Sequence, residues 1–260
     1  MSLVSFDDVG KTYRSLNGVD YQALEHFSVE IEVGEFFCLL GPSGCGKTTV
    51  LKMLAGFEAP TSGQISMSGR PVTGAGRDRG LVFQGDDSLY GWLTGVENVE
   101  FGLRMRGVAK SERRERALRY LKLVGLSGQE QKYPAELSGG MKQRIQIARV
   151  LANEPQMLLM DEPFAALDAQ TRSLMQGELA GIWRATRTTV LFITHDIDEA
   201  VTLGTRIGVM EAGPRSRVKG VVDVALDGER RRTDDAFLRY FMQGYEMIRD
   251  EVAKSIARAD

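Results

Sequence analysis

The sequence has no long run of hydrophobic residues. Its longest apolar runs hold five residues at positions 36–40 and four at 190–193, whereas a helix that crosses a membrane needs about 20. The first eight residues include two aspartates and lack the basic stretch followed by an apolar one that marks a secretory signal. We therefore expect a protein that neither spans the bilayer nor is exported.

Cysteine is scarce, and neither sign of charge is in excess. Cys38 and Cys45 are the two cysteines among 260 residues, too few for a disulfide framework or a metal cluster, so we expect two reduced thiols. Lys and Arg number 33 against 35 Asp and Glu, which gives a formal net charge of −2. Without a basic surplus, bulk binding to nucleic acid or anionic lipid is not indicated, although a local basic patch stays open.

Glycine, by contrast, is abundant, at 29 of 260 residues or about 11%, against an average of about 7%. The glycines gather beside apolar runs, as strand-to-helix turns that approach a ligand closely require. Their clusters lie at residues 41–46, 56–63, 74–80 and 139–140. Buried strands are predicted at about residues 34–40, 80–84, 156–161, 189–194 and 206–210. Because helical patterns lie between several of these strands, the predicted fold class is α/β with a substantially parallel sheet.

Residues 86–155 show a helical pattern and are predicted to form an insertion between two halves of the sheet. Ser111 is expected to cap a helix that ends at Gly125, with the charges at 112–116 on its solvated face. The apolar face of this helix is predicted to hold Ala117, Leu118, Leu121 and Val124.

A further helix is predicted near the C-terminus. Three arginines at 230–232 are followed by Thr233, which is placed to cap it. Apolar residues at helical spacing follow at Phe237, Phe241, Tyr245, Ile248, Val252 and Ile256. We expect this helix to dock on the core, with contact to a partner as the alternative.

Residues 41–49, GPSGCGKTT, match the phosphate-binding pattern GxxxxGK[ST] and lie between a predicted strand and an apolar helix. The glycines let backbone N–H groups point toward an anion, and the helix N-terminus adds its positive end. Lys47 is expected to supply a full charge to the β and γ phosphates of a nucleotide, and Thr48 a hydroxyl ligand to Mg²⁺. The predicted nucleotide-binding residues of this loop are Gly41, Pro42, Ser43, Gly44, Cys45, Gly46, Lys47, Thr48 and Thr49.

A second apolar run, at residues 157–160, ends in Asp161 and Glu162. Two adjacent carboxylates at the end of a buried strand are costly without a cation, which favours a metal and phosphate site over the alternative of an exposed acidic turn. Asp161 is placed to hold Mg²⁺ through water, and Glu162 to orient or deprotonate an attacking water.

A third motif, LSGGMKQR at residues 137–144, lies between these two. With it, the sequence resembles the ATP-binding cassette family, whose signature LSGGQ it is similar to, with Met141 in the glutamine position. Ser138, Gly139 and Gly140 offer N–H groups at the start of a helix as a second anion site. In the family this element contacts the γ-phosphate held by the other subunit, so the resemblance implies a head-to-tail homodimer that encloses two ATP molecules.

The resemblance implies roles for further residues. Gln84 is similar to the family's glutamine that reaches Mg²⁺ and the attacking water and senses the transport partner. His195, in ITHD, resembles the switch histidine that bonds the γ-phosphate and couples to Glu162. Asp168, in ALD, resembles the loop that crosses the dimer interface.

The adenine contact is assigned by the same resemblance. Tyr13 is similar to the aromatic residue that stacks on adenine, with Tyr21 as its competitor and a packed strand tyrosine as the other reading. The implied catalytic residues are Lys47, Gln84, Glu162 and His195, and the implied metal contacts are Thr48, Gln84 and Asp161.

The resemblance covers about residues 3–225 and implies a P-loop NTPase core of the RecA-like type. This core has a mostly parallel sheet, an antiparallel β part near the N-terminus and an inserted helical subdomain. The predicted domains are an ATP-binding core at 1–85 and 156–225, a helical signature subdomain at 86–155 and a C-terminal helical extension at 226–260.

Narrower features are similar to the ATPase subunits of nitrate, sulfonate and taurine importers. They are GRDRG at 76–80, LYGWL at 89–93, ENV at 97–99 and DEPFAALD at 161–168. Gly91 stands where those proteins usually have proline, and Ala165 where glycine is common. Trp92 is predicted either to dock a membrane partner or to lie in the core of the helical subdomain.

The leading hypothesis is an ATPase that energises a solute importer as a peripheral protein at the cytoplasmic face of the inner membrane. Its implied cofactors are ATP and Mg²⁺. Its implied partners are a second copy, transmembrane permease subunits and a periplasmic or extracellular solute-binding protein, with no nucleic acid. Taurine or another sulfonate is the first candidate solute, and nitrate is the next.

Two alternatives stay open. A soluble cassette ATPase in DNA repair, translation or iron–sulfur assembly predicts a second cassette, a long coiled coil or a basic face, although an assembly factor needs none of these. A regulatory subunit that binds ATP without turnover predicts the loss of Glu162 or His195, and both are present.

Overall fold

The computed structural model describes residues 1–14, 18–82, 89–165, 167–226, 228 and 230–257. Within these ranges the chain divides into two compact units, Met1–Gly76 with Thr188–Asp260, and Arg77–Arg187. None of the helices in these ranges combines the length and apolar character that crossing a membrane requires.

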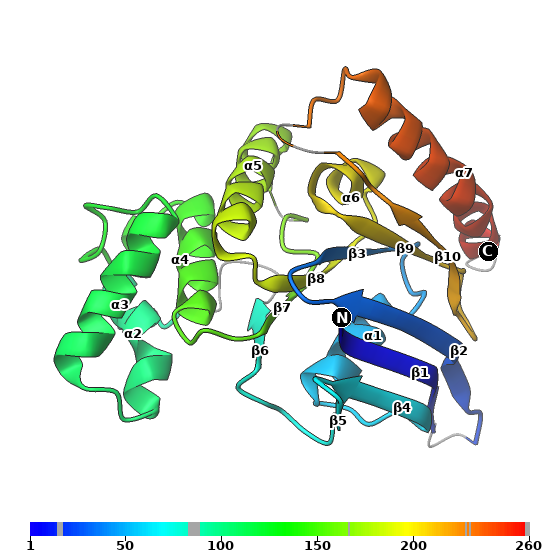
Figure 1. Ribbon diagram of the computed structural model, residues 1–260, viewed down its shortest axis with the longest axis horizontal. Coiled ribbons are helices and arrows are strands. Elements are labelled where there is room, and N and C mark those ends of the chain that lie inside the picture. Colours follow the sequence, from blue (N-terminus) through cyan, green and yellow to red (C-terminus); the bar gives the residue numbers. More distant parts are fainter. Residues whose placement is uncertain (15–17, 83–88, 166, 227, 229, 258–260) are drawn as a thin grey trace. The chain divides into compact units, whose positions relative to one another are not determined.

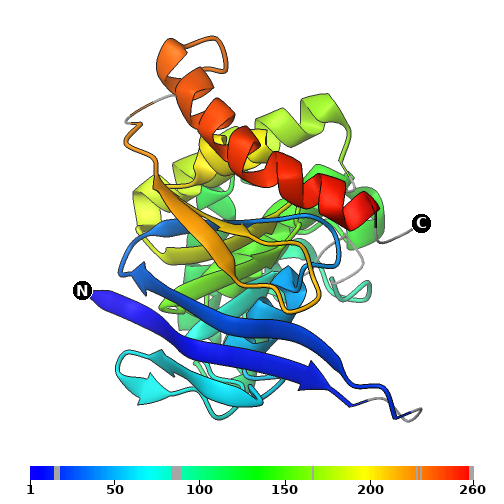
Figure 2. The same ribbon diagram turned by 90° about the vertical axis from the view of Figure 1, so that its right-hand side faces the viewer.

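The N-terminal part of the first unit is an antiparallel sheet (Figures 1 and 2). Its strands are β1 (Ser2–Tyr13), β2 (Tyr21–Glu32), β4 (Ser62–Met67) and β5 (Arg70–Pro71), in the order β2-β1-β4-β5. Burial alternates along the second half of β2, where Phe27, Val29 and Ile31 are buried and the residues between them are exposed. This period of two covers the core with one face and leaves the other to solvent, which confirms the predicted antiparallel part.

The rest of the first unit is built on strands that run mostly in parallel. β8 (Thr189–Thr194) and β9 (Arg206–Met210) pair in parallel with β3 (Phe36–Leu40) on its two sides, and β10 (Val218–Asp223) pairs antiparallel with β9. Every residue of β3 and β8 is buried. Leu40 lies opposite Thr194, so both strands end at the same edge, where α1 (Lys47–Ala55) and α6 (Ile197–Leu203) follow.

The second unit holds two parallel strands and most of the helical insertion. β6 (Arg79–Val82) pairs with β7 (Met157–Asp161). The helices are α2 (Gly95–Met105), α3 (Lys110–Leu123), the 3-10 helix η1 (Pro134–Glu136), α4 (Gly139–Leu151) and α5 (Ala169–Thr186). The five predicted strands are present as β3, β6, β7, β8 and β9, which confirms the α/β class.

The predicted details of α3 were wrong in three respects. The helix begins one residue before Ser111, because the carbonyl of Ala109 already accepts the N–H of Arg113 at 2.9 Å. Leu118 is 39% exposed, because at 3.6 residues per turn it lies about 100° around the helix from Ala117. Arg113 and Arg114 do not merely face solvent, since both pair with Glu100 of α2.

The C-terminal helix α7 (Asp235–Ile256) packs against α6, β9 and β10 (Figures 1 and 2). Its N-cap is Asp234, whose carbonyl accepts the N–H of Leu238, so the predicted cap at Thr233 was wrong by one residue. Phe237 and Ile248 are buried as predicted, and Phe241 is half-buried. Tyr245 and Val252 are exposed, which corrects their place in the core-facing stripe.

A buried carboxylate fixes α7 to the body of the first unit. Glu251 is 1% exposed, and its Oε2 accepts the N–H of Ala212 at 3.0 Å. Its Oε1 accepts hydrogen bonds from Lys219 Nζ and Lys254 Nζ, both at 2.9 Å. Burial on its own raises the pKa of Glu251, but these hydrogen bonds outweigh it and lower the pKa to about 2.

We predict that Glu251 makes stability depend on acid pH. Its folded pKa lies below the unfolded value of about 4.3, so the ionised carboxylate stabilises the fold above that pH, and this contribution is lost as the pH falls toward 2. Glu251→Gln should lower the free energy of unfolding by about 2 kcal/mol at pH 7. Urea unfolding should show the gap to wild type shrinking between about pH 5 and pH 3. A gap that stays constant over this range would contradict the assignment.

Candidate functional site

The phosphate-loop sequence forms a tight turn between β3 and α1. Gly44 and Gly46 have φ values of 75° and 100°, in the left-handed region that favours glycine. Gly46 is the N-cap of α1 and has no side chain that could cap the first helical turn. A helix N-terminus of this kind offers its backbone N–H groups to an external anion.

Lys47 closes the loop upon itself. Its side chain is almost completely buried, and its Nζ donates to the carbonyl oxygens of Gly41 at 2.8 Å and Pro42 at 3.0 Å. The ammonium group is therefore held inside the turn, where it adds a full positive charge to the N–H groups of the helix end. Thr48 is exposed and Thr49 is half-buried at the start of α1.

The two cysteines contribute no exposed thiol. Cys38 and Cys45 are both buried, and neither forms a disulfide. Burial raises the pKa of the Cys38 thiol, which keeps it protonated. The Cys45 sulfur lies 3.9 Å from the sulfur of Met210 in β9. Cys45 therefore offers the phosphate loop its backbone, while its side chain packs inward.

His195 lies at the same sheet edge as the phosphate loop. It directly follows β8 and is exposed, and the register of β8 against β3 places Thr194 opposite Leu40. After it, Asp196 caps α6 by accepting the N–H groups of Asp198 and Glu199. His195 is thus held between a buried strand and a capped helix, next to the start of the phosphate loop.

The two candidate adenine-stacking tyrosines lie directly opposite each other in the β1–β2 pair. The hydroxyl of Tyr13 donates to Glu58 Oε2 at 2.7 Å and lies 3.3 Å from the Thr49 hydroxyl of the phosphate loop. Burial and the nearby Glu58 carboxylate raise the pKa of Tyr13. Tyr21 is exposed. The structure therefore brings Tyr13 next to the loop, half-buried and anchored through its hydroxyl.

In the second unit, β7 delivers the acidic pair. Asp161 is its last residue and is half-buried. Glu162 has a φ of 44°, a left-handed conformation that is unusual for any residue except glycine. Such backbone strain persists where the surroundings fix it, and it collects at functional sites.

Gln143 of α4 helps to fix this turn. Its buried side-chain amide donates to the carbonyl of Pro163, one residue after Glu162, at 2.7 Å. Sequence reasoning missed this residue. The sequence did carry a signal for it: Gln143 precedes Ile147 by four residues and Leu151 by eight, which places a polar side chain on the buried face of α4.

The signature sequence forms the N-terminus of α4. Ser138 is the exposed N-cap, and its hydroxyl accepts the N–H of Met141 at 3.3 Å. Gly139 and Gly140 form the first turn, and a side chain at Gly139 would meet no atom within 4 Å. The expected helix start is therefore present, with open space beside Gly139.

Asp168 is the N-cap of α5. Its Oδ1 accepts the N–H groups of Gln170 and Thr171, both at 3.0 Å, and hydrogen bonds from Thr171 foremost lower its pKa. Gln84, the remaining predicted site residue, lies outside the described residues, as does Ala166 of the same motif as Asp168.

An aromatic cluster next to α2 presents Trp92 to solvent. Trp92 is 74% exposed, so its predicted alternative as a core residue was wrong. Its ring centroid lies 5.3 Å from that of Tyr90, which in turn lies 4.4 Å from Phe101. Tyr90 and Phe101 line a cavity of about 300 Å³ together with Arg77, Arg79, Arg106 and Arg149. This surface combines exposed aromatic area with positive charge.

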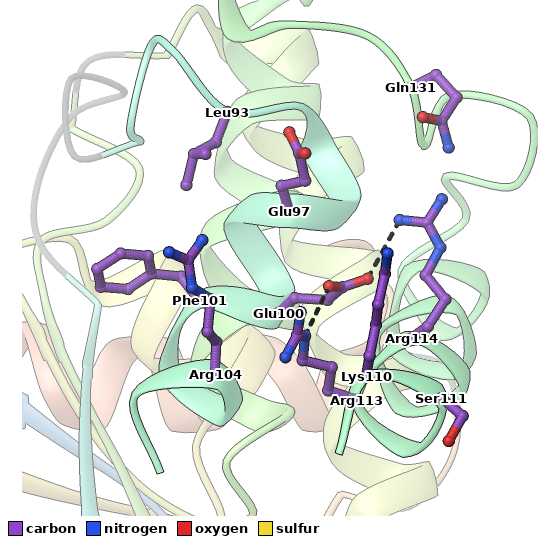
Figure 3. Close-up of a pocket in the computed structure, with 10 residues that line it drawn as sticks. All are labelled: Leu93, Glu97, Glu100, Phe101, Arg104, Lys110, Ser111, Arg113, Arg114 and Gln131. Atoms are coloured by element: carbon purple, nitrogen blue, oxygen red, sulfur yellow. Dashed lines mark hydrogen bonds and ion pairs between the residues drawn. The ribbon is translucent and has the colours of Figure 1, made fainter. Parts of the chain in front are cut away.

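A larger cavity, of about 950 Å³, which Phe101 also lines, lies between α2 and α3 (Figure 3). In this cavity the Glu100 carboxylate accepts hydrogen bonds from Arg113 Nε and Arg114 Nη1, both at 3.1 Å. These pairs cross from α2 to α3 and brace the two helices. The main charges of this cavity therefore have a structural use.

Asn98 shapes the loop that carries Trp92. It is completely buried, and its Nδ2 donates to the carbonyls of Tyr90, Leu93 and Thr94 at 3.2, 3.0 and 3.0 Å. Its Oδ1 accepts the N–H of Tyr90 at 2.9 Å. All four hydrogen bonds of this amide bind the backbone on both sides of Trp92.

Comparison with known proteins identifies a matching family and similar import proteins. A family model described as ABC transporter matches residues 24–165. The chain is 49% identical to the taurine import ATP-binding protein TauB of Burkholderia pseudomallei, over 89% of this chain and 87% of that protein. It is 50% identical to the nitrate import ATP-binding protein NrtD of Synechocystis sp., over 74% of this chain and 72% of that protein.

A solved structure is also similar. It is the dimeric structure of a post-hydrolysis state of the ATP-binding cassette MJ0796 bound to ADP and Pi. The TM-score is 0.72 and the identity 33%, over 86% of this chain and 100% of that one.

We predict that Asn98→Ala lowers the free energy of unfolding of this chain by about 2–4 kcal/mol, because buried backbone groups of the Trp92 loop lose their partner. Glu97→Ala, which removes the neighbouring capping-box carboxylate, is the matched control and should cost about 1 kcal/mol. Urea titration measures both. Equal losses for the two variants would show that Asn98 has no special role in the loop.

Proposed function

The chain belongs to the ABC transporter family and is an ATPase, and we propose that it powers the uptake of a solute through separate membrane permease subunits. The observation that carries the proposal is the phosphate loop closed by Lys47 beside His195 at one sheet edge. The high identity to import ATP-binding proteins over most of the chain supports the importer role. Taurine or another sulfonate is the first candidate solute, and nitrate is the next.

ATP fits the phosphate loop. The open helix end at Gly46, together with the Lys47 ammonium, matches the charge of the β and γ phosphates. Tyr13 supplies a half-buried aromatic ring near the loop for the adenine. The remaining loop residues contribute backbone N–H groups and the hydroxyl of Thr49.

Mg²⁺ fits the donor set. No cluster of three or more His, Cys, Asp or Glu side chains occurs in the part of the chain that the structure describes, and Mg²⁺ commonly uses one or two carboxylates together with substrate phosphates and water. Thr48 and Asp161 would hold it, with Gln84 as a further ligand. When bound, the ion neutralises charge that develops on the phosphate oxygens.

Catalysis then rests on position and charge. Glu162, held in its strained turn with help from Gln143, orients the attacking water and accepts its proton at the carboxylate. Lys47 and the backbone N–H groups stabilise the γ-phosphate, and His195 donates a hydrogen bond to it. In a head-to-tail homodimer, Ser138, Gly139 and Gly140 of the second copy approach the same phosphate, and Asp168 lies at the interface.

The work divides among three parts of the chain. Residues 1–85 and 156–225 bind and hydrolyse ATP, residues 86–155 carry the signature and the docking surface, and residues 226–260 form the extension with α7. The protein acts as a peripheral subunit at the cytoplasmic face of the inner membrane, in a complex that includes a solute-binding protein.

The permease docks on the aromatic cluster of Tyr90, Trp92 and Phe101. Trp92 supplies the exposed apolar area that central interface residues commonly have. The neighbouring arginines favour a cytoplasmic permease segment with apolar residues and a carboxylate. Asn98 fixes the loop that presents this surface.

The catalytic assignment predicts different defects for two variants. Glu162→Gln should bind ATP, accumulate a closed dimer and lose steady-state hydrolysis, because the amide cannot accept the proton from water. Lys47→Ala should instead lose nucleotide affinity. Phosphate release, ATP binding and sedimentation distinguish them. Near-normal turnover in Glu162→Gln would remove Glu162 from its role, and unchanged ATP binding by Lys47→Ala would contradict the phosphate site.

The transport assignment predicts an effect of the docking surface on uptake. Cells that carry Trp92→Ala should take up labelled taurine or, failing that, nitrate at least about tenfold more slowly than wild type, since loss of a central aromatic residue commonly costs more than 2 kcal/mol. Phe57→Ala, which removes an exposed aromatic residue of the first unit, is the control and should transport normally. Wild-type uptake of both solutes in cells with Glu162→Gln would rule out the importer.

A further inference from the structure

The last residue of β9 and the segment that follows it lie against the phosphate loop. A Cβ at Gly213 would lie 3.0 Å from the carbonyl oxygen of Gly44 and 3.5 Å from Cys45 Cα. At the start of this segment, Met210 contacts the Cys45 sulfur, and a Cβ at Gly41 would come within 3.1 Å of Met210 Cβ. The contact is backbone to backbone, with no room for a side chain between. We name residues 210–216 the buttress segment.

Two anchors hold the buttress segment. At its far end, Ser216 pairs with β2, donating its N–H to Ala23 and accepting the N–H of Glu25. Near the phosphate loop, the buried N–H of Ala212 donates to Glu251 Oε2 of α7 at 3.0 Å. Ala212 directly precedes Gly213, so the α7 anchor lies at the point of contact with the loop.

The Glu251 carboxylate is itself oriented. Lys219 Nζ and Lys254 Nζ both donate to Oε1, which leaves Oε2 for Ala212. Lys219 Nζ also donates to the carbonyl of Met247 in α7 at 2.8 Å, which ties β10 to the same helix turn. A buried ionised carboxylate needs such partners, and its charge-assisted bonds fix geometry more closely than apolar packing does.

We propose that Glu251 is a positioning residue for ATP binding, and that the docked α7 holds the buttress segment, and through it Gly44 and Cys45, where the loop can receive phosphate. The proposal rests on the phosphate site proposed at residues 41–49. Binding sites of this kind must hold their groups within about 0.5 Å of the productive geometry. Loss of the anchor lets the loop populate other positions. The apparent affinity for nucleotide then falls in proportion to the fraction of molecules whose loop is still in the binding-competent position.

The test compares full-length Glu251→Ala, Glu251→Gln and Glu246→Ala, the last an exposed carboxylate on the same helix as matched control. Binding of Mg-ADP by calorimetry reports the site without hydrolysis. Hydrogen exchange of residues 41–49 without nucleotide reports the loop itself. The ATP concentration dependence of hydrolysis separates KM from kcat.

Glu251→Ala should weaken Mg-ADP binding and raise KM about fivefold to twentyfold, speed exchange in residues 41–49 and leave kcat near wild type. Glu251→Gln should give a KM between those of wild type and Glu251→Ala, because its amide oxygen can still accept from Ala212 while the charge-assisted bonds from Lys219 and Lys254 are weakened. Glu246→Ala should match wild type throughout.

A purely structural role would behave differently, lowering the active fraction and the apparent kcat with an unchanged KM. That result, or wild-type exchange in residues 41–49, would overturn the proposal. If Glu251→Ala does not fold, Glu251→Gln decides: a measurable rise in KM and in exchange of the loop supports the positioning role, and wild-type values overturn it. Lys47→Ala in the same assay keeps the two ideas apart, because normal Mg-ADP binding there would refute the phosphate site itself.

Discussion

The phosphate loop must direct its backbone N–H groups toward an anion while its other face packs against the protein. Lys47 satisfies part of this constraint by bonding the carbonyls of Gly41 and Pro42, so the positive charge and the turn are fixed together. The two left-handed glycines allow the chain to bend sharply enough. The buried parallel strands β3 and β8 then bring the loop and His195 to one edge. The rest of the first unit serves to hold this edge in place.

In the second unit, the backbone conformation at Glu162 is the corresponding constraint. Glu162, the residue that we propose acts on water, has a left-handed backbone, which a side chain adopts only at a cost in strain. The side-chain amide of Gln143 donates to the carbonyl of Pro163, the next residue, and helps to offset that cost. A buried hydrogen bond therefore joins α4 to the turn at Glu162.

Sequence patterns predicted the elements that local chemistry determines. Apolar runs, glycines and capping residues determine the strands, the phosphate loop and the start of the signature helix. These signals can be recognised in the sequence without knowledge of the tertiary contacts. The misses depend on tertiary contacts. Ser111 has the residue type of a cap, yet the helix begins earlier, and Tyr245 has helical spacing with the core residues of α7, yet it is 42% exposed. The roles of Glu251 and Gln143 could not be predicted because their partners lie far away in the sequence. The role of Asn98 could not be predicted because its partners are backbone atoms, which leave no signal in the sequence.

We propose that two copies of this chain share each ATP, one with its phosphate loop and the other with its signature helix. The most direct measurement is the rate of phosphate release per chain from Mg-ATP over a wide range of protein concentration. We expect the rate of phosphate release per chain to rise with protein concentration and then to reach a plateau as dimers form. A rate per chain that is constant down to the lowest concentrations, where sedimentation shows only single chains in the presence of ATP, would contradict it.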